Sequence, residues 1–151
     1  RNPTNFGTST VASADTRRQL YAAIFSSVSG TFTADEEINQ ASTGAVGKVV
    51  EYDSTNKILY YYQTRFPDVG TDSNGNQTAF SGANAITGQS SSASATPDTS
   101  NSTTTNGAVF VSGYSNPELA FDSGDIIYVE ERSPITRASD QTENIKLIIE
   151  F

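Results

Sequence analysis

The sequence GYSNPELAFDSGDIIYVEERSPITRASDQTENIKLIIEF, residues 113–151, holds the most consistent local signals of the chain. Asn116 can cap a short helix, Pro117 suits its first position, and Gly124 can end it. A β-rich run over 125–131 and an alternating apolar run at the chain end are typical of strands. We therefore predict a helix followed by two strands that pair antiparallel.

The first 28 residues hold a polar arm and an ambiguous apolar segment. Residues 1–16 are small and polar, as in an arm or linker. Over 17–28, Leu20 and Ile24 fit the stripe of a helix and also the period of two of a strand. Because the serines that follow disfavour a helix, we predict a strand.

Residues 29–63 contain the clearest hairpin signal, and we predict a small β-hairpin or barrel module there. Two β-rich runs, 48–52 and 57–63, flank the polar connector 53–56. The length of that connector suits a hairpin built around a type I turn.

The next polar segment can be interpreted in two ways. Asp72, Asn74 and Asn76 alternate as oxygen donors, as the ligands of a calcium loop do. The EF-hand pattern places its glycine at the sixth position and an acid at the twelfth, whereas Gly75 stands fourth and Ala83 twelfth here. A hairpin turn at Asn74 and Gly75 is the better interpretation.

Residues 88–107, GQSSSASATPDTSNSTTTNG, form a stretch of low complexity. The stretch has no large apolar side chain, so we predict that it adds nothing to the core and runs over the surface as a loop. A brief strand over 108–112 follows, leading into 113–151. Together the patterns predict a single β-rich unit over 1–151.

Composition limits the possible functions. The chain has 151 residues, a net charge of −8, no cysteine and no histidine. A thiolate metal site, a disulfide and a histidine base are therefore impossible within it. An acidic balance argues against nucleic-acid binding, and no apolar run is long enough for a membrane span. We predict no cofactor.

Paired carboxylates are the remaining route to catalysis, as in glycosidases. The candidate pairs are Asp35 with Glu37, Asp122 with Asp125, and Glu130 with Glu131. Adjacent strand residues face opposite sides, and the other two pairs fit ordinary turns. We predict that the chain is not an enzyme.

Charged residues near the C-terminus suggest either a partner contact or an internal clamp. Arg132 and Arg137 can each form planar bidentate pairs with carboxylates, and Glu130 and Asp140 lie nearby in sequence. The clamp is the favoured interpretation. Three other arginines could act similarly, and the sequence does not rank them: Arg17, Arg18 and Arg65.

Three consecutive tyrosines give a second hint of a contact surface. In a strand, Tyr61 must face the side opposite to Tyr60 and Tyr62. Tyrosines are favoured in protein contacts, but a β-sandwich that buries both faces explains the pattern equally well. The fold class predicted is all-β, mostly antiparallel hairpins in sandwich or small-barrel layers, with at most one short helix near Pro117.

The C-terminal succession NPEL, SGDIIYVEERSPI and DQTENIKLIIEF resembles the end of a homodimeric baseplate wedge subunit of T4-type contractile-tailed phages. The resemblance is specific over 117–151. Upstream, only the general style is similar to marine-phage versions. Because that family's chain is longer, we expect a C-terminal portion or a shortened form.

The resemblance implies a structural role in the virion, in a contractile-tail baseplate. It implies contacts with other wedge proteins, a homodimer in the full-length form, and no catalytic or cofactor residues. The alternative function is a glycan- or host-binding β-module of a phage fibre or decoration protein, since polar loops rich in Ser, Thr and Asn suit sugar recognition.

Overall fold

The computed structural model describes residues 2–13, 18–63, 69–120 and 123–124, and its regular elements are all strands. The predicted strands at 125–131 and at the chain end lie outside the described residues, as do Arg132, Arg137, Glu130 and Asp140. The strands are β1 (Tyr21–Ile24), β2 (Glu37–Gln40), β3 (Ala45–Asp53), β4 (Ile58–Tyr62), β5 (Ile86–Gly88), β6 (Ser94–Ala95), β7 (Thr104–Thr105), β8 (Ala108–Val109) and β9 (Tyr114–Ser115).

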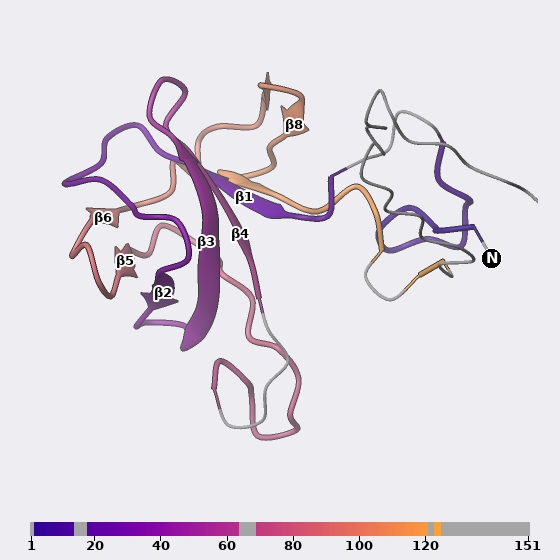
Figure 1. Cartoon of the computed structure of the whole chain (residues 1–151), viewed down its shortest axis with the longest axis horizontal. Coiled ribbons are helices and arrows are strands. Elements are labelled where there is room, and N and C mark those ends of the chain that lie inside the picture. Colours follow the sequence, from indigo (N-terminus) through magenta and orange to yellow (C-terminus); the bar gives the residue numbers. More distant parts are fainter. Residues whose placement is uncertain (1, 14–17, 64–68, 121–122, 125–151) are drawn as a thin grey trace, which may run out of the picture.

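Seven of these strands form one antiparallel sheet in the order β6-β5-β2-β3-β4-β1-β9, and β7 and β8 form a separate two-stranded hairpin. Figure 1 shows β3 and β4 running through the middle of the sheet, with the segment that carries β8 above them. The prediction of an all-β, antiparallel fold is confirmed, and so is the strand within 17–28, which is β1.

The β3–β4 hairpin is the centre of the sheet, as its sequence predicts. Its turn is organised by Asp53, whose carboxylate accepts hydrogen bonds from the backbone N–H groups of Thr55 and Asn56 at 2.9 and 3.1 Å. Lys57 completes the turn with a φ of 54°. A short polar side chain that bonds the backbone two and three residues on is a common way to fix such a turn.

The core lies on both faces of the sheet because side chains alternate along each strand. Leu59 and Tyr61 of β4 join the larger cluster with Phe32, Ile38 and Val49. The opposite face of β4 and β1 forms a second cluster, which the β7–β8 hairpin covers from outside. Its members are Ala22, Ile24, Ile58, Ala108 and Phe110, with Tyr60 packed against them.

The N-terminal arm is held by the segment that follows β9. Asn5 forms an isolated antiparallel bridge with Leu119, and Thr4 accepts a backbone hydrogen bond from Ala120. Figure 1 shows the N-terminal arm and the segment after β9 lying together, apart from the sheet. The short helix expected after Asn116 is absent from 116–120, because this arm holds the backbone extended.

The low-complexity stretch contributes to the core, so the prediction that it only covers the surface is wrong. Ala93 and Ala95 are buried in the larger cluster, and β5 and β6 extend the sheet. Alanine side chains are large enough to fill the core there, because the backbone of this stretch lies close to the segments around it, as the hydrogen bonds between Ser29 and Ser94 show. Farther along, Asn106 and Gly107 form the tight turn of the β7–β8 hairpin with φ values of 49° and 77°.

Glu36 anchors that stretch to the sheet. Its side chain is only 5% exposed. The carboxylate accepts hydrogen bonds from the backbone N–H groups of Thr33, Ser90 and Ser91 at 2.6, 3.1 and 2.9 Å. It also accepts one from the Ser91 hydroxyl at 2.8 Å. One carboxylate therefore fixes the turn before β2 and the turn between β5 and β6.

Acid is expected to destabilise the fold through Glu36. Burial raises the pKa of this carboxyl, but the hydrogen bonds from Ser91, Thr33 and Ser90 outweigh it, so the net pKa lies below its ordinary value of 4.5. The stabilisation is complete above the unfolded-state pKa and is lost as the pH falls through the lower folded-state pKa.

Glu36→Gln tests this linkage. The amide NH₂ would face backbone donors, so we expect a loss of about 2 kcal/mol at pH 7 and a flatter dependence of the unfolding free energy on pH below 4.5. The control is Glu37→Gln, an exposed neighbour in β2. Denaturant titrations between neutral and acidic pH measure both, and equal pH slopes for wild type and Glu36→Gln would contradict the assignment.

Candidate functional site

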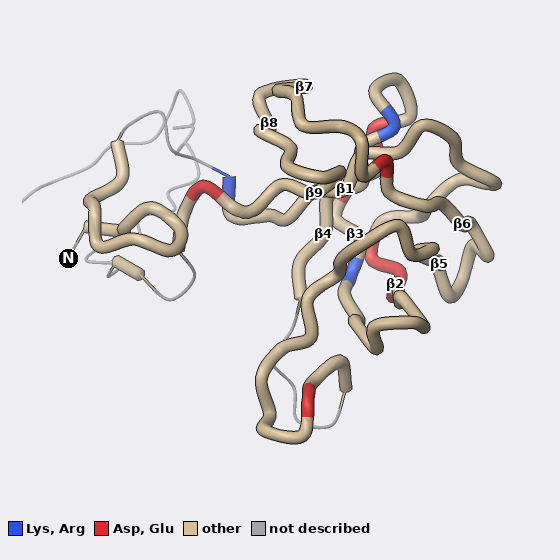
Figure 2. Tube along the Cα trace, turned by 180° about the vertical axis from the view of Figure 1, so that it is seen from behind, with Lys and Arg blue, Asp and Glu red and all other residues tan. Residues whose placement is uncertain are grey.

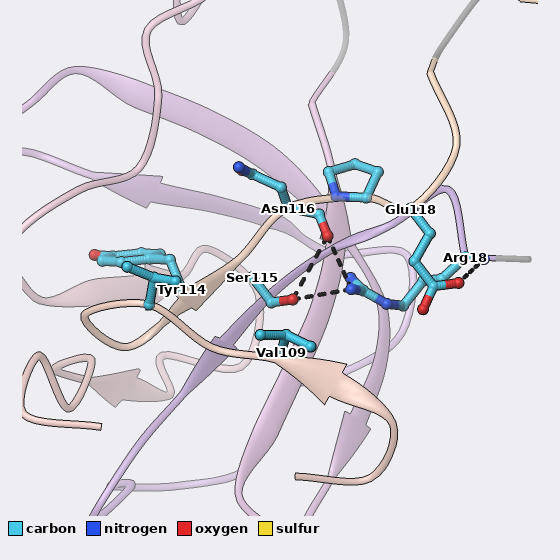
Figure 3. A pocket seen from close by; sticks show the side chains of 8 residues that line it. Arg18, Val109, Tyr114, Ser115, Asn116 and Glu118 are labelled. Carbon is cyan, nitrogen blue, oxygen red and sulfur yellow. Dashed lines mark hydrogen bonds between the residues drawn. The ribbon is translucent and has the colours of Figure 1, made fainter. Parts of the chain in front are cut away.

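A groove of about 480 Å³ lies beside β8 and is the candidate contact site. One wall comes from the β8 strand and the residues after it, and the other from β9 and the segment that follows. Figure 3 shows Val109 on the first wall opposite Ser115 and Arg18 on the second. The lining residues are Arg18, Val109, Val111, Tyr114, Ser115, Asn116, Pro117 and Glu118.

The alternation of β8 leaves two valines on the outside. Ala108 and Phe110 point inward and are 1% exposed each, whereas Val109 and Val111 are 61% and 68% exposed. A strand with apolar residues on both faces is typical of strands covered on both sides. We call Val109 and Val111 the valine ridge, an exposed apolar edge of the groove.

Arg18 forms the polar end of the groove. Its guanidinium donates a hydrogen bond to the backbone oxygen of Leu20 at 2.6 Å. It also donates to the backbone oxygen of Asn116 at 2.8 Å and to the Ser115 hydroxyl at 2.9 Å (Figure 3). Its backbone N–H donates to the Glu118 carboxylate at 3.0 Å. Arg18 therefore ties the chain before β1 to the chain after β9.

The Arg18 guanidinium is partly buried beside Glu118. Burial lowers the pKa of this guanidinium, and the opposing Coulombic effects of Glu118 and Tyr60 offset that lowering only in part. Arginine stays protonated under all ordinary conditions, so Arg18 places a positive charge at the groove.

The sequence-based candidates fall in different places. Tyr61 is 2% exposed and packs its ring on Tyr21 at 5.7 Å and against Phe80 at 4.8 Å, so it is a core residue rather than an exposed one. Asp35 and Glu37 are exposed, as expected of a solvated turn.

The turn around Asn74 and Gly75 is confirmed. Asp72 accepts hydrogen bonds from the backbone N–H groups of Asn74 and Asn76, and Thr71 bridges Gln77. The carboxylate oxygens of Asp72, which a calcium loop would direct at an ion, here organise the turn itself.

Three important features were not singled out by the sequence pattern. Glu36 lies between Asp35 and Glu37 in sequence, and nothing local reveals its partners Ser90 and Ser91. The clamp role of Arg18 was one of several equal options. Asn106 and Gly107 give a hairpin signal directly before the valine ridge, but that signal does not indicate that Val109 and Val111 form the exposed face.

Charge and donor clusters are sparse over the described part of the chain. Its basic residues are Arg18, Lys48 and Lys57, which are spread over the fold in Figure 2. The described residues include no group of three or more acidic side chains placed to hold a metal ion. Within the same ranges, no helix is long and apolar enough to cross a membrane.

The fold and the groove define an acidic all-β protein built from antiparallel strands. A family model described as bacteriophage T4, Gp8 matches residues 55–151, more than half of the chain. The chain therefore belongs to this family of baseplate wedge subunits, as the C-terminal resemblance indicates, and is a structural protein of the phage tail baseplate. Comparison with curated proteins and with solved structures gives no match.

Proposed function

We propose that the chain acts in the baseplate wedge through protein–protein contacts made at the valine ridge and the groove beside it. The observation that carries this proposal is the exposure of Val109 and Val111, at 61% and 68%, on a strand whose inner residues are fully packed. Exposed apolar surface next to polar groups is characteristic of contact sites.

The fold holds this ridge rigidly. The inner residues of β8 pack on Ile24 and Ile58, and Val111 exchanges backbone hydrogen bonds with Tyr114 at 2.8 and 3.2 Å. A preorganised surface loses little conformational entropy when a partner binds. Other wedge proteins are the proposed partners, and a homodimer in the full-length form is part of the same proposal. A structural role of this kind requires no catalysis.

The sugar-binding alternative has less support. A second hollow is rich in hydroxyl groups, and none of the described residues that line it is an aromatic on which a sugar ring could stack. Its lining residues are Ser26, Ser27, Ser29, Ser94, Ala95, Thr96, Pro97, Asp98, Thr99 and Ser100.

A charged substitution on the ridge tests the proposal. Val111→Asp is expected to reduce incorporation of the chain into baseplates at least about tenfold, because it places a carboxylate in an apolar contact. The matched control is Val69→Asp, a valine that is 50% exposed and lies outside the groove. The measurement is the number of copies per purified baseplate, by quantitative mass spectrometry.

Two checks make the result interpretable. Thermal unfolding of the isolated variants should show that both fold. Equal incorporation of Val111→Asp and Val69→Asp would overturn the proposal.

A further inference from the structure

The free edge of β8 is a second feature of the groove, distinct from the valine side chains. Directly after β8, the backbone N–H of Phe110 donates to the backbone oxygen of Thr103, the residue before β7, at 2.9 Å. Backbone groups alternate in direction along an antiparallel strand, so the N–H and C=O of Val109 point away from β7. Among the described strands, β7 alone pairs with β8. Among the described residues, none hydrogen-bonds to the N–H or the C=O of Val109.

The groove runs along this free edge. Val111, which bridges Tyr114, and Arg18 also line the groove. An exposed strand edge is a template for another strand, and natural proteins usually shield such edges with charge, proline or a covering segment. The sequence neighbours of Val109, Ala108 and Phe110, are neither charged nor proline, and no described strand pairs with its outward edge.

The charge at the end of the groove indicates what kind of segment fits. The Arg18 guanidinium donates three hydrogen bonds to described groups, fewer than the donors it carries. Because these three hydrogen bonds do not use all of its donors, a carboxylate from a partner would add a charge-assisted hydrogen bond there.

We propose that the groove receives an extended segment of a neighbouring baseplate protein, which adds to the free edge of β8 as a strand. The segment hydrogen-bonds to the N–H and C=O of Val109, places apolar side chains against the valine ridge, and directs a carboxylate at Arg18. Strand addition gives affinity through the backbone and specificity through alternate side chains. This inference rests on the proposed function and names the chemistry of its partner.

A pair of proline substitutions tests strand addition. Val109→Pro removes the outward N–H while keeping an apolar ring, and an edge strand tolerates proline where its N–H faces outward. Thr104→Pro is the matched control, because Thr104 lies opposite Val109 in the hairpin and its N–H also points away from the partner strand.

We expect Val109→Pro to lower incorporation into baseplates at least about tenfold and Thr104→Pro to leave it within about twofold. Val109→Ala, which keeps the N–H, should fall between them. Equal incorporation of the two proline variants would overturn strand addition. If the two proline variants were incorporated equally but Val111→Asp still lost incorporation, strand addition would be wrong and the proposed contact at the valine ridge would stand.

Amide exchange gives an independent readout that needs no substitution. The Val109 N–H should exchange rapidly in the isolated chain and at least about tenfold more slowly in the assembled baseplate. Unchanged exchange on assembly would overturn the proposal. Protection that appears in the isolated chain as its concentration rises would assign the edge to a second copy, and would overturn it equally.

Discussion

Gly113→Ala is expected to destabilise the protein by about 3 kcal/mol. Gly113 has a φ of 80°, and an added Cβ would lie 2.7 Å from the backbone oxygen of Asp98. Backbone hydrogen bonds from Gly113 to Asn101 at 2.9 Å and from Ile24 to Gly113 at 3.0 Å prevent the turn from moving aside. Left-handed strain and a backbone clash therefore combine at this position.

Gly107→Ala separates the two effects. Gly107 also has a positive φ, of 77°, but no atom lies within 4 Å of an added Cβ. We expect a loss of about 1 kcal/mol, from backbone strain alone. Urea unfolding of both variants measures the difference, and equal losses would show that the turn before β9 accommodates a methyl group.

Tyr61→Ala is expected to cost about 4 kcal/mol, because it removes a buried aromatic ring from the centre of the larger cluster. The ring is 2% exposed and contacts both Tyr21 and Phe80. Tyr62→Ala, the next residue along β4, removes a partly exposed ring, and we expect it to cost about 1 kcal/mol.

The comparison also settles whether Tyr61 serves the core or a partner. Calorimetric or denaturant unfolding of the isolated chain provides the measurement. A Tyr61→Ala variant with wild-type stability but poor incorporation into baseplates would contradict its assignment to the core.

Local sequence predicted those parts of the fold that local interactions create. The β3–β4 hairpin and the turn at Gly75 are fixed by side chains such as Asp53 and Asp72, which bond the backbone within four residues. The alternation of Tyr60 and Tyr61 between two faces was likewise predictable, because it follows from strand geometry.

Contacts between distant segments could not be predicted in this way. Glu36 meets Ser91 across 55 residues, and Arg18 meets Ser115 across 97. Composition alone misjudged residues 88–107, because an alanine can enter a core when the backbone around it is anchored. The absent helix after Asn116 has the same cause: its backbone pairs with the N-terminal arm instead.

The candidate site was only partly visible in the sequence. Val109 and Val111 were expected within a brief strand, but the period of two gives no indication of which face is covered. The buried face is identified by Phe110, which packs with Ile24 and Ile58 in the smaller core cluster. The free backbone edge follows from its hydrogen bond to Thr103, a detail of pairing register that only the structure reveals.

The most direct test of the account is an electron cryo-microscopy map of the phage baseplate at the β7–β8 hairpin. We expect a neighbouring protein to cover Val109 and Val111, with an extended backbone alongside Val109 and an acidic side chain near Arg18. A map in which both valines face solvent in the assembled baseplate would contradict the assignment of this groove as the contact site.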